Sequence, residues 1–295
     1  MTLPRRPMRR TFARDRGAPE PSRIVLSDAE RRALVEIDVA VLARNAREVQ
    51  VRMIETGEDV TVRPSRTRAS LPPHIVPGQV ATLVLGFGLR RPGYAVGELR
   101  SFRVDAVALR LRKLRLHERG VLAVSANLPK ARVTLEGPRS AHEMQQVLPS
   151  IKGGRDPILA SIRRRERGEL DRAAALLLGL VRRDFRCIDA HAHLGNLAFW
   201  VCAEHARLHY EVGAAIGDHA LGPDFRGALP WLYENNRPFL RCLYGLGLSL
   251  WRLGRMRDAA RVFGRMLWLN PADEQGAGRC LRHVRAGCPW ETDGS

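Results

Sequence analysis

Leu246-Gly-Leu-Ser-Leu-Trp-Arg-Leu-Gly254, followed by Ala259, Phe263 and Pro271, is the stretch that decides the fold of the C-terminal half. Glycine at position 254 ends a first helix and permits a tight turn. Ala259 is small where two helices cross closely, and Phe263 fills the space between them. Pro271 ends the second helix, because proline cannot continue one. The spacing predicts a helical hairpin over residues 240–273.

The same spacing recurs twice toward the N-terminus. The earlier units are marked by Leu194-Gly195, Ala206 and Tyr210 in residues 188–221, and by Gly168, Ala173 and Leu177 in residues 154–187. An insertion, residues 222–239, separates the second unit from the third. A final helix near residues 273–285 is expected to cap the stack, since about three repeats are needed for stability.

These units resemble tetratricopeptide repeats. More narrowly, the chain is similar to a poorly characterised bacterial family with an N-terminal β-rich module ahead of such repeats. The residues that carry this resemblance are Asp189-Ala-His-Ala-His-Leu-Gly-Asn196, His209-Tyr-Glu-Val-Gly213, Leu221-Gly-Pro-Asp-Phe225, Asn236-Arg-Pro-Phe-Leu-Arg241 and Leu269-Asn-Pro271, with Pro77-Gly78 and Tyr94-Ala-Val-Gly-Glu98 as weaker pointers. The resemblance covers roughly residues 36–116 and 138–285, and it implies a fold but no activity.

In the N-terminal part of the chain, the spacing of apolar residues changes from a helical to a strand-like period. Apolar residues at three- and four-residue spacing predict a helix from Asp38 to about Gly57. Alternating or β-rich stretches then predict strands at 59–63, 79–85 and 94–104, which suit a small barrel. Leu109 to Leu116 alternates apolar and basic residues, and this predicts a further strand with one cationic face.

We therefore predict an α+β chain: a small β-rich, barrel-like N-terminal module followed by an all-α, tetratricopeptide-like solenoid. The expected parts are a disordered basic tail (1–23), a helix with the β-rich module (24–119), a linker with one helical piece near 141–148 (120–153), the repeats with their capping helix (154–287), and a short tail (288–295).

Composition and charge limit the cellular compartment and the classes of partner that we expect for the protein. Its 295 residues carry 49 Lys+Arg against 31 Asp+Glu, a net charge of +18, of which residues 1–120 hold +11 and residues 151–295 hold +6. No segment approaches the ~18 apolar residues of a membrane span, and the N-terminus has no signal-peptide core. Five cysteines without a CxxC pair indicate buried thiols in a reducing cytoplasm.

The groove of the solenoid is the first candidate site. The residues expected to line it are Asp189, His193, Asn196, Phe199, Arg241 and Tyr244. Asn196 and Arg241 resemble part of a carboxylate clamp, which holds a peptide terminus by charge-assisted hydrogen bonds. Ordinary polar groove residues are the alternative interpretation.

The insertion is the second candidate. Its Trp231, Asn236 and Arg237 either form a lid or ligand wall over the groove or anchor the loop on the last helix pair. Trp200, Trp251 and Trp268 are expected in the core.

Histidines form the third candidate. Cys202, His205 and His209 share one helical face, and the last two have the i, i+4 spacing of helical zinc sites. Without an evident fourth ligand, we expect a solvated histidine face, and we predict no metal and no cofactor.

The function predicted from these features is a non-enzymatic adaptor that binds a protein or peptide, in an oligomeric state that the sequence leaves open. The alternative is a nucleic-acid-associated protein that uses the basic tail and Arg110, Arg112, Lys113 and Arg115, with salt-sensitive binding. A metal-dependent enzyme is third, since no catalytic motif is found.

Overall fold

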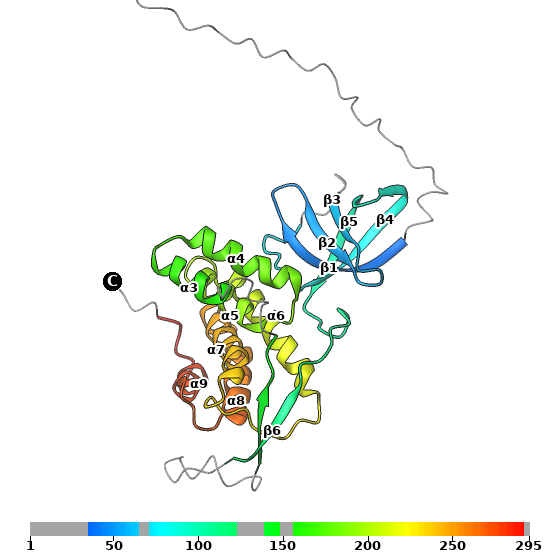
Figure 1. Ribbon diagram of the computed structural model, residues 1–295. Coiled ribbons are helices and arrows are strands. Elements are labelled where there is room, and N and C mark those ends of the chain that lie inside the picture. The colour runs from blue at the N-terminus through cyan, green and yellow to red at the C-terminus, as the bar shows by residue number, and fades with distance from the viewer. Residues whose placement is uncertain (1–34, 65–70, 123–138, 148–155, 292–295) are drawn as a thin grey trace, which may run out of the picture.

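The computed structural model describes residues 35–64, 71–122, 139–147 and 156–291. Within these ranges a closed five-stranded barrel precedes seven α-helices, which confirms the predicted α+β class and its β-rich N-terminal module (Figure 1). The predicted tail 1–23 lies outside the described residues.

The barrel is built mostly from neighbouring antiparallel strands. Its strands are β1 (Val35–Arg44), β2 (Val49–Met53), β3 (Asp59–Pro64), β4 (Val80–Arg91) and β5 (Tyr94–Arg103). They follow the order β1-β2-β3-β5-β4, β4 pairs with β1, and the β3–β5 pair is parallel. The predicted strands at 59–63, 79–85 and 94–104 are thereby confirmed.

The predicted helix from Asp38 to Gly57 is wrong, because this stretch is the β1–β2 hairpin. Val39 and Val41 point into the barrel core. The intervening Ala40 and Leu42 are also buried, because they pack outward against Phe185 of the helical half. A strand buried on both faces loses the apolar–polar alternation that identifies a strand in sequence.

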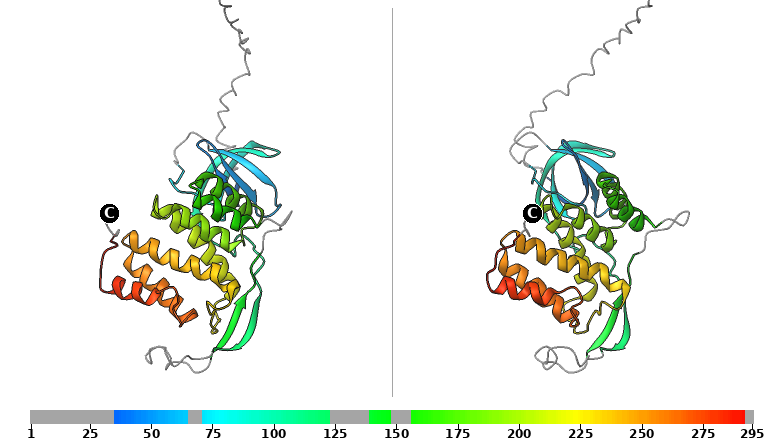
Figure 2. Two further views of the ribbon diagram at one scale, coloured as in Figure 1. Left: turned by 60° about the vertical axis from the view of Figure 1, so that its left-hand side comes forward. Right: turned by 90° about the vertical axis from the view of Figure 1, so that its left-hand side faces the viewer.

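The connection after the barrel differs from the prediction in two places. The expected strand at 109–116 is absent from the described residues, since Asp105 caps a turn and Arg110 has a left-handed φ of 54°. The expected helix near 141–148 is instead strand β7 (Ser140–Met144), paired with β6 (Leu116–Val121). This two-stranded sheet lies beside the helical stack, far from the barrel (Figures 1 and 2).

The helices occur in the order that the repeat spacing predicts. They are α3 (Pro157–Glu166), α4 (Leu170–Arg183), α5 (Ile188–Ala198), α6 (Ala203–Leu221), α7 (Arg237–Arg252), α8 (Met256–Leu269) and α9 (Ala277–Arg285), with a 3-10 turn η2 (Glu234–Asn236) before α7. Gly168 and Gly254, with φ of 77° and 73°, form the α3–α4 and α7–α8 turns. Among the described helices, none combines the length and apolarity needed to cross a membrane.

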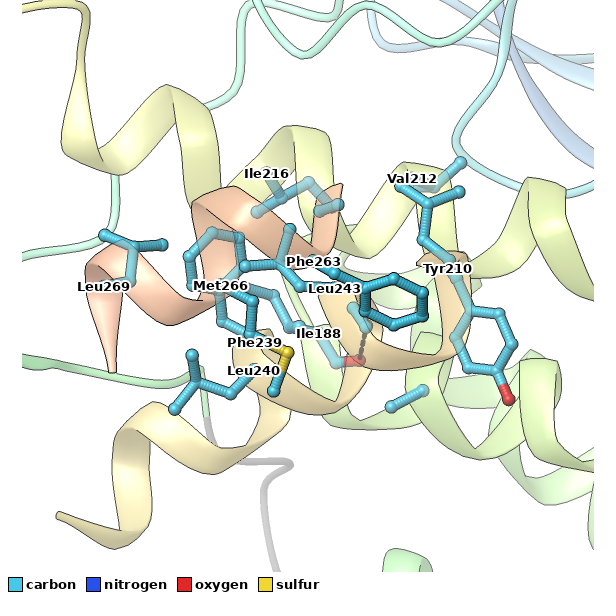
Figure 3. Packing of buried hydrophobic residues seen from close by; sticks show 14 of the residues in the cluster. Ile188, Tyr210, Val212, Ile216, Phe239, Leu240, Leu243, Phe263, Met266 and Leu269 are labelled. Carbon is cyan, nitrogen blue, oxygen red and sulfur yellow. Dashed lines mark hydrogen bonds between the residues drawn. The ribbon is translucent and has the colours of Figure 1, made fainter. Parts of the chain in front are cut away.

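Close packing between first and second helices rests on glycine. Tyr210 of α6 lies between α5 and α7, where a Cβ on Gly195 or Gly245 would come within 2.5 or 2.3 Å of its ring. Phe263 of α8 packs in the same way on Gly247 of α7. The aromatic residues therefore fill the gaps that the spacing predicted, and Figure 3 shows Tyr210 and Phe263 within the helical core.

The barrel docks on the α4–α6 end of the helical stack (Figure 2). Arg182 of α4 donates to the carbonyl of Leu42 at 3.4 Å and to the side chain of Gln50. The turn before β4 places Gly78 (φ 87°) against α6, where a Cβ would lie 2.7 Å from Val212 Cγ1. The two halves thus share a packed interface rather than a free linker.

Candidate functional site

The predicted groove residues lie on the first helices of neighbouring pairs. Arg241 at the start of α7 donates through Nη1 to Asp189 Oδ1 at 3.1 Å. His193 lies one turn along α5, with its Nε2 3.7 Å from the same oxygen. Burial, opposed by Asp189, lowers the pKa of His193. These three side chains form a polar contact between α5 and α7.

The structure does not bring Asn196 and Arg241 together. Asn196 is exposed, and its Oδ1 accepts a hydrogen bond of 2.7 Å from the Tyr210 hydroxyl. Arg241 is held at Asp189, seven residues earlier on α5, which corresponds to about 10 Å of helix. A terminal carboxylate therefore cannot engage both side chains in this arrangement.

Phe199 and Tyr244 pack against neighbouring residues. Phe199 is 7% exposed, and its ring contacts Trp200 and Trp290. The Tyr244 hydroxyl lies 3.6 Å from Cys280 Sγ of α9, and burial raises the pKa of Tyr244. Trp200, expected in the core, is instead 65% exposed in the α5–α6 turn.

Within the insertion, Asn236 is a structural residue. It is completely buried, its Oδ1 accepts from the backbone N–H of Met144, and its Nδ2 donates to the carbonyls of His142 and Pro230. Because the Asn236 amide is buried and engaged in these hydrogen bonds, Asn236 does not contribute to a lid over the groove. It ties the insertion to β7, whereas the two roles expected from the sequence were a lid and an anchor on the last helix pair.

Trp231 and Arg237 take a different position. The guanidinium carbons of Arg237 and Arg241 lie 5.6 and 5.8 Å from the Trp231 ring centroid, and Arg237 Nε donates to the Trp231 carbonyl. The two arginines border a cleft of about 250 Å³ at the N-terminal ends of α3, α5 and α7. Asp189 and Asn235 also line it, so the cleft is polar and contains both signs of charge.

The histidine face of α6 is not solvated as expected. His209 is 3% exposed, and its ring lies 5.1 Å from that of His205. His74, from the segment before β4, contributes a third ring 5.8 Å from His205. Cys202 Sγ lies 3.5 Å from His74 Nε2. No sequence pattern links His74 to this face, because only the docking of the barrel brings it to α6.

Behind this group lies His191 of α5. It is completely buried, its ring is 6.0 Å from that of His209, and neither of its ring nitrogens has a hydrogen-bond partner among the described residues. Burial lowers the pKa of His191 to about 4. His193, two residues further along α5, lies beside Asp189 instead, so these two histidines do not share a site.

The four basic candidates lie at the exposed surface of the connection after the barrel. They are Arg110, Arg112, Lys113 and Arg115. Arg110 pairs with Glu55 at 2.7 Å. Lys113 lines a second, wider cleft of about 970 Å³ between this connection, α6, α8 and the insertion.

Comparison with known proteins gives no further guide to this site. No protein-family model matches the chain, and no curated protein matches it.

Proposed function

We propose that the helical half is a tetratricopeptide-like solenoid that acts as a non-enzymatic adaptor, binding a protein or peptide on the surface of its first helices. The helix order, the glycine turns and the aromatic-on-glycine packing support this family assignment. Five unpaired cysteines suit the reducing cytoplasm in which such an adaptor would act.

The observation that carries the binding role is the cleft bordered by Arg237 and Arg241, whose guanidinium groups also flank the ring of Trp231. An aromatic ring flanked by arginines is the composition typical of binding hot spots. Among the described residues, Arg241 uses only Nη1 in hydrogen bonding, which leaves guanidinium donors for a ligand. The N-terminal ends of α5 and α7 also favour a negative group. We infer that the bound segment presents a carboxylate to the free donors of Arg241 and hydrogen-bond donors to Asp156, Asp189 and Glu234, which also line the cleft.

Site-specific crosslinking tests this proposal. A photo-crosslinking amino acid replaces the exposed Asn196 in the groove, and the control replaces Arg261, which is 77% exposed on α8. We expect a discrete adduct in cells from position 196 alone, lost when R237A and R241A are added. Equal adducts from both positions, or an adduct that survives the double substitution, would contradict groove binding.

The wider cleft supports a second candidate, binding of single-stranded nucleic acid. Lys113, Arg226 and Arg265 line it together with the rings of Phe225 and Trp268. Cationic side chains beside aromatic rings suit phosphates and stacked bases. Phe225 and Arg226 are adjacent in the chain, and Arg265 and Trp268 are three residues apart, but only the fold brings these two pairs together with Lys113.

Filter binding of a labelled single-stranded oligonucleotide, repeated over a range of salt concentrations, tests the second candidate. We expect K113A/R226A to weaken binding and to reduce its salt dependence, whereas R261A, on the exposed side of α8, leaves both unchanged. Absence of binding at low salt, or equal effects of both variants, would exclude this cleft.

A further inference from the structure

The junction between the barrel and α6 gathers four side chains of the types that bind transition metals. His74 comes from the segment leading into β4, Cys202 immediately precedes α6, and His205 and His209 lie on α6. The barrel and the helical half therefore each contribute to one cluster. Three imidazoles and a thiol match the nitrogen and sulfur ligands that zinc prefers.

The spacing between Cys202 and His74 fits a shared metal. Zn–S and Zn–N bonds of about 2.3 and 2.0 Å at a tetrahedral angle place the two ligand atoms about 3.5 Å apart. Cys202 Sγ and His74 Nε2 are 3.5 Å apart. This distance also suits a weak S–H···N hydrogen bond. The positions of the other two histidines are therefore needed to distinguish a metal site from a hydrogen bond.

The ring separations supply that second observation. Two imidazoles on one tetrahedral zinc have centroids about 5 Å apart, since each centroid lies roughly 3 Å from the metal. The His205 and His209 centroids are 5.1 Å apart, and those of His74 and His205 are 5.8 Å apart. His205 and His209 are also spaced i, i+4, which lets two histidines of one helix face a common ion.

One member of the cluster also has a buried polar atom without a hydrogen-bond partner in the residues that the structure describes. His209 is 3% exposed, and its Nδ1 makes no hydrogen bond within the described part of the chain. A lone pair left unpaired in the interior costs free energy, which a bound cation would offset.

We propose that His74, Cys202, His205 and His209 bind a zinc ion that joins the barrel to α6. Among the described residues, no three such side chains already surround one metal position. Binding therefore requires rotation of imidazole rings about their side-chain bonds. The Cys202 thiol loses its proton to solvent as the zinc–sulfur bond forms, and the three histidines coordinate through neutral ring nitrogens.

The ion would act as a structural link. It would connect residue 74 to residues 202–209 across the interface where Gly78 packs on Val212. This role rests on neither binding function proposed above, because it needs no groove and no basic cleft.

Metal loading of the untagged full-length chain tests the site. The protein is loaded with Zn²⁺, dialysed, and its metal content is measured by mass spectrometry. C202S and H74A remove ligands, while C288S and H283A remove exposed residues of the same types as matched controls. We expect one zinc per chain in the wild type and both controls, and at least tenfold weaker binding in the two ligand variants. Wild-type protein without stoichiometric zinc, or ligand variants that load like the controls, would overturn the proposal.

Cobalt replaces zinc in a second measurement that needs no variant. Co²⁺ bound to the wild-type chain is expected to show a thiolate-to-cobalt charge-transfer band and the intense visible bands of a tetrahedral site. If C202S or H74A fails to fold, this spectrum decides alone. A spectrum of octahedral Co²⁺ without the thiolate band refutes the site.

Discussion

The amide oxygen of Asn236 accepts a hydrogen bond of 2.8 Å from the backbone N–H of Met144, and both residues are completely buried. Its Nδ2 donates to the carbonyls of His142 and Pro230. One side chain thus contacts three backbone groups from β7 and the insertion. The Met144 N–H and the His142 carbonyl depend on it, whereas the Pro230 carbonyl also accepts from the Tyr233 N–H.

Replacement of Asn236 by alanine is therefore expected to lower the free energy of unfolding by about 3 kcal/mol, because the backbone N–H of Met144 and the carbonyl of His142 lose their partner. Chemical denaturation with circular dichroism measures the change. The neighbouring N235A serves as control, because the Asn235 side chain makes one hydrogen bond, to Glu143, at a partly exposed position, and the backbone carbonyl that accepts from Gln146 is kept. We expect that control to cost about 1 kcal/mol. Equal losses would show that Asn236 is not a special anchor.

Glycine beneath Tyr210 gives a second prediction. In G245A the new methyl group would approach the Tyr210 ring to 2.3 Å, so we expect a loss of about 2 kcal/mol from overpacking. In G264A, on α8, a Cβ meets nothing within 4 Å. There, alanine is expected to stabilise the helix by about 0.5–1 kcal/mol. Thermal unfolding of both variants compares these opposite signs, and a G245A variant as stable as the wild type would contradict the packing.

The turn at Gly78 tests how the barrel is docked. G78A and G57A each force an alanine into a positive φ, which costs about 1 kcal/mol. Only at position 78 does the new methyl group also meet α6, at Val212. We expect G78A to expose the segment around residues 76–79 to proteolysis, while G57A leaves the cleavage pattern unchanged. The same pattern in both variants would mean that docking does not depend on this contact.

Asp218 and Arg265 predict a pH dependence of stability. Burial, opposed by the ion pair with Arg265, raises the pKa of Asp218 to about 6, from an ordinary value of 3.8. The folded protein therefore binds this proton more tightly than the unfolded chain does. The contribution to stability is complete below the unfolded pKa and is lost as the pH rises through the folded pKa.

The difference in unfolding free energy between wild type and D218N isolates this effect. We expect it to shift in favour of the wild type by about 1 kcal/mol between about pH 7.5 and about pH 4.5, allowing for solvent screening of the partly exposed pair. R265Q removes the counter-charge, so its stability should fall most at the higher pH. A pH-independent difference would show that burial does not perturb the carboxyl.

The elements whose sequence signals lie close together in the chain could be predicted. The helices of residues 157–285 follow from their apolar spacing and from the turn glycines Gly168 and Gly254, whose signals lie within one hairpin. Strand β1 was missed because Ala40 and Leu42 are buried against the helical half, so its outward face is apolar too. Strand β7 was missed because its partners at Ala228 and Asn236 are distant in the chain.

The candidate sites were likewise predictable only where a sequence pattern identifies their residues. Asp189, Arg241 and Trp231 were identified from helix register and composition. The structure joins Asp189 and Arg241 in one polar contact that lines a cleft, with the Trp231 ring beside Arg241. His74 could not be assigned to α6 from sequence, since its position there depends on a contact across 128 residues with Cys202. Long-range docking, rather than local propensity, decides which candidates meet.

The contacts of β7 have a consequence for synthesis of the chain. The carbonyl of His142 accepts a hydrogen bond from Asn236, which lies 94 residues later in the chain. During translation this carbonyl therefore lacks its amide partner until the intervening helices have been synthesised. Pairing across such separations is slow, because loop closure costs entropy before the contact contributes. The β6–β7 ribbon is therefore expected to gain protection from hydrogen exchange late, after α3–α6 have formed, although it precedes them in translation.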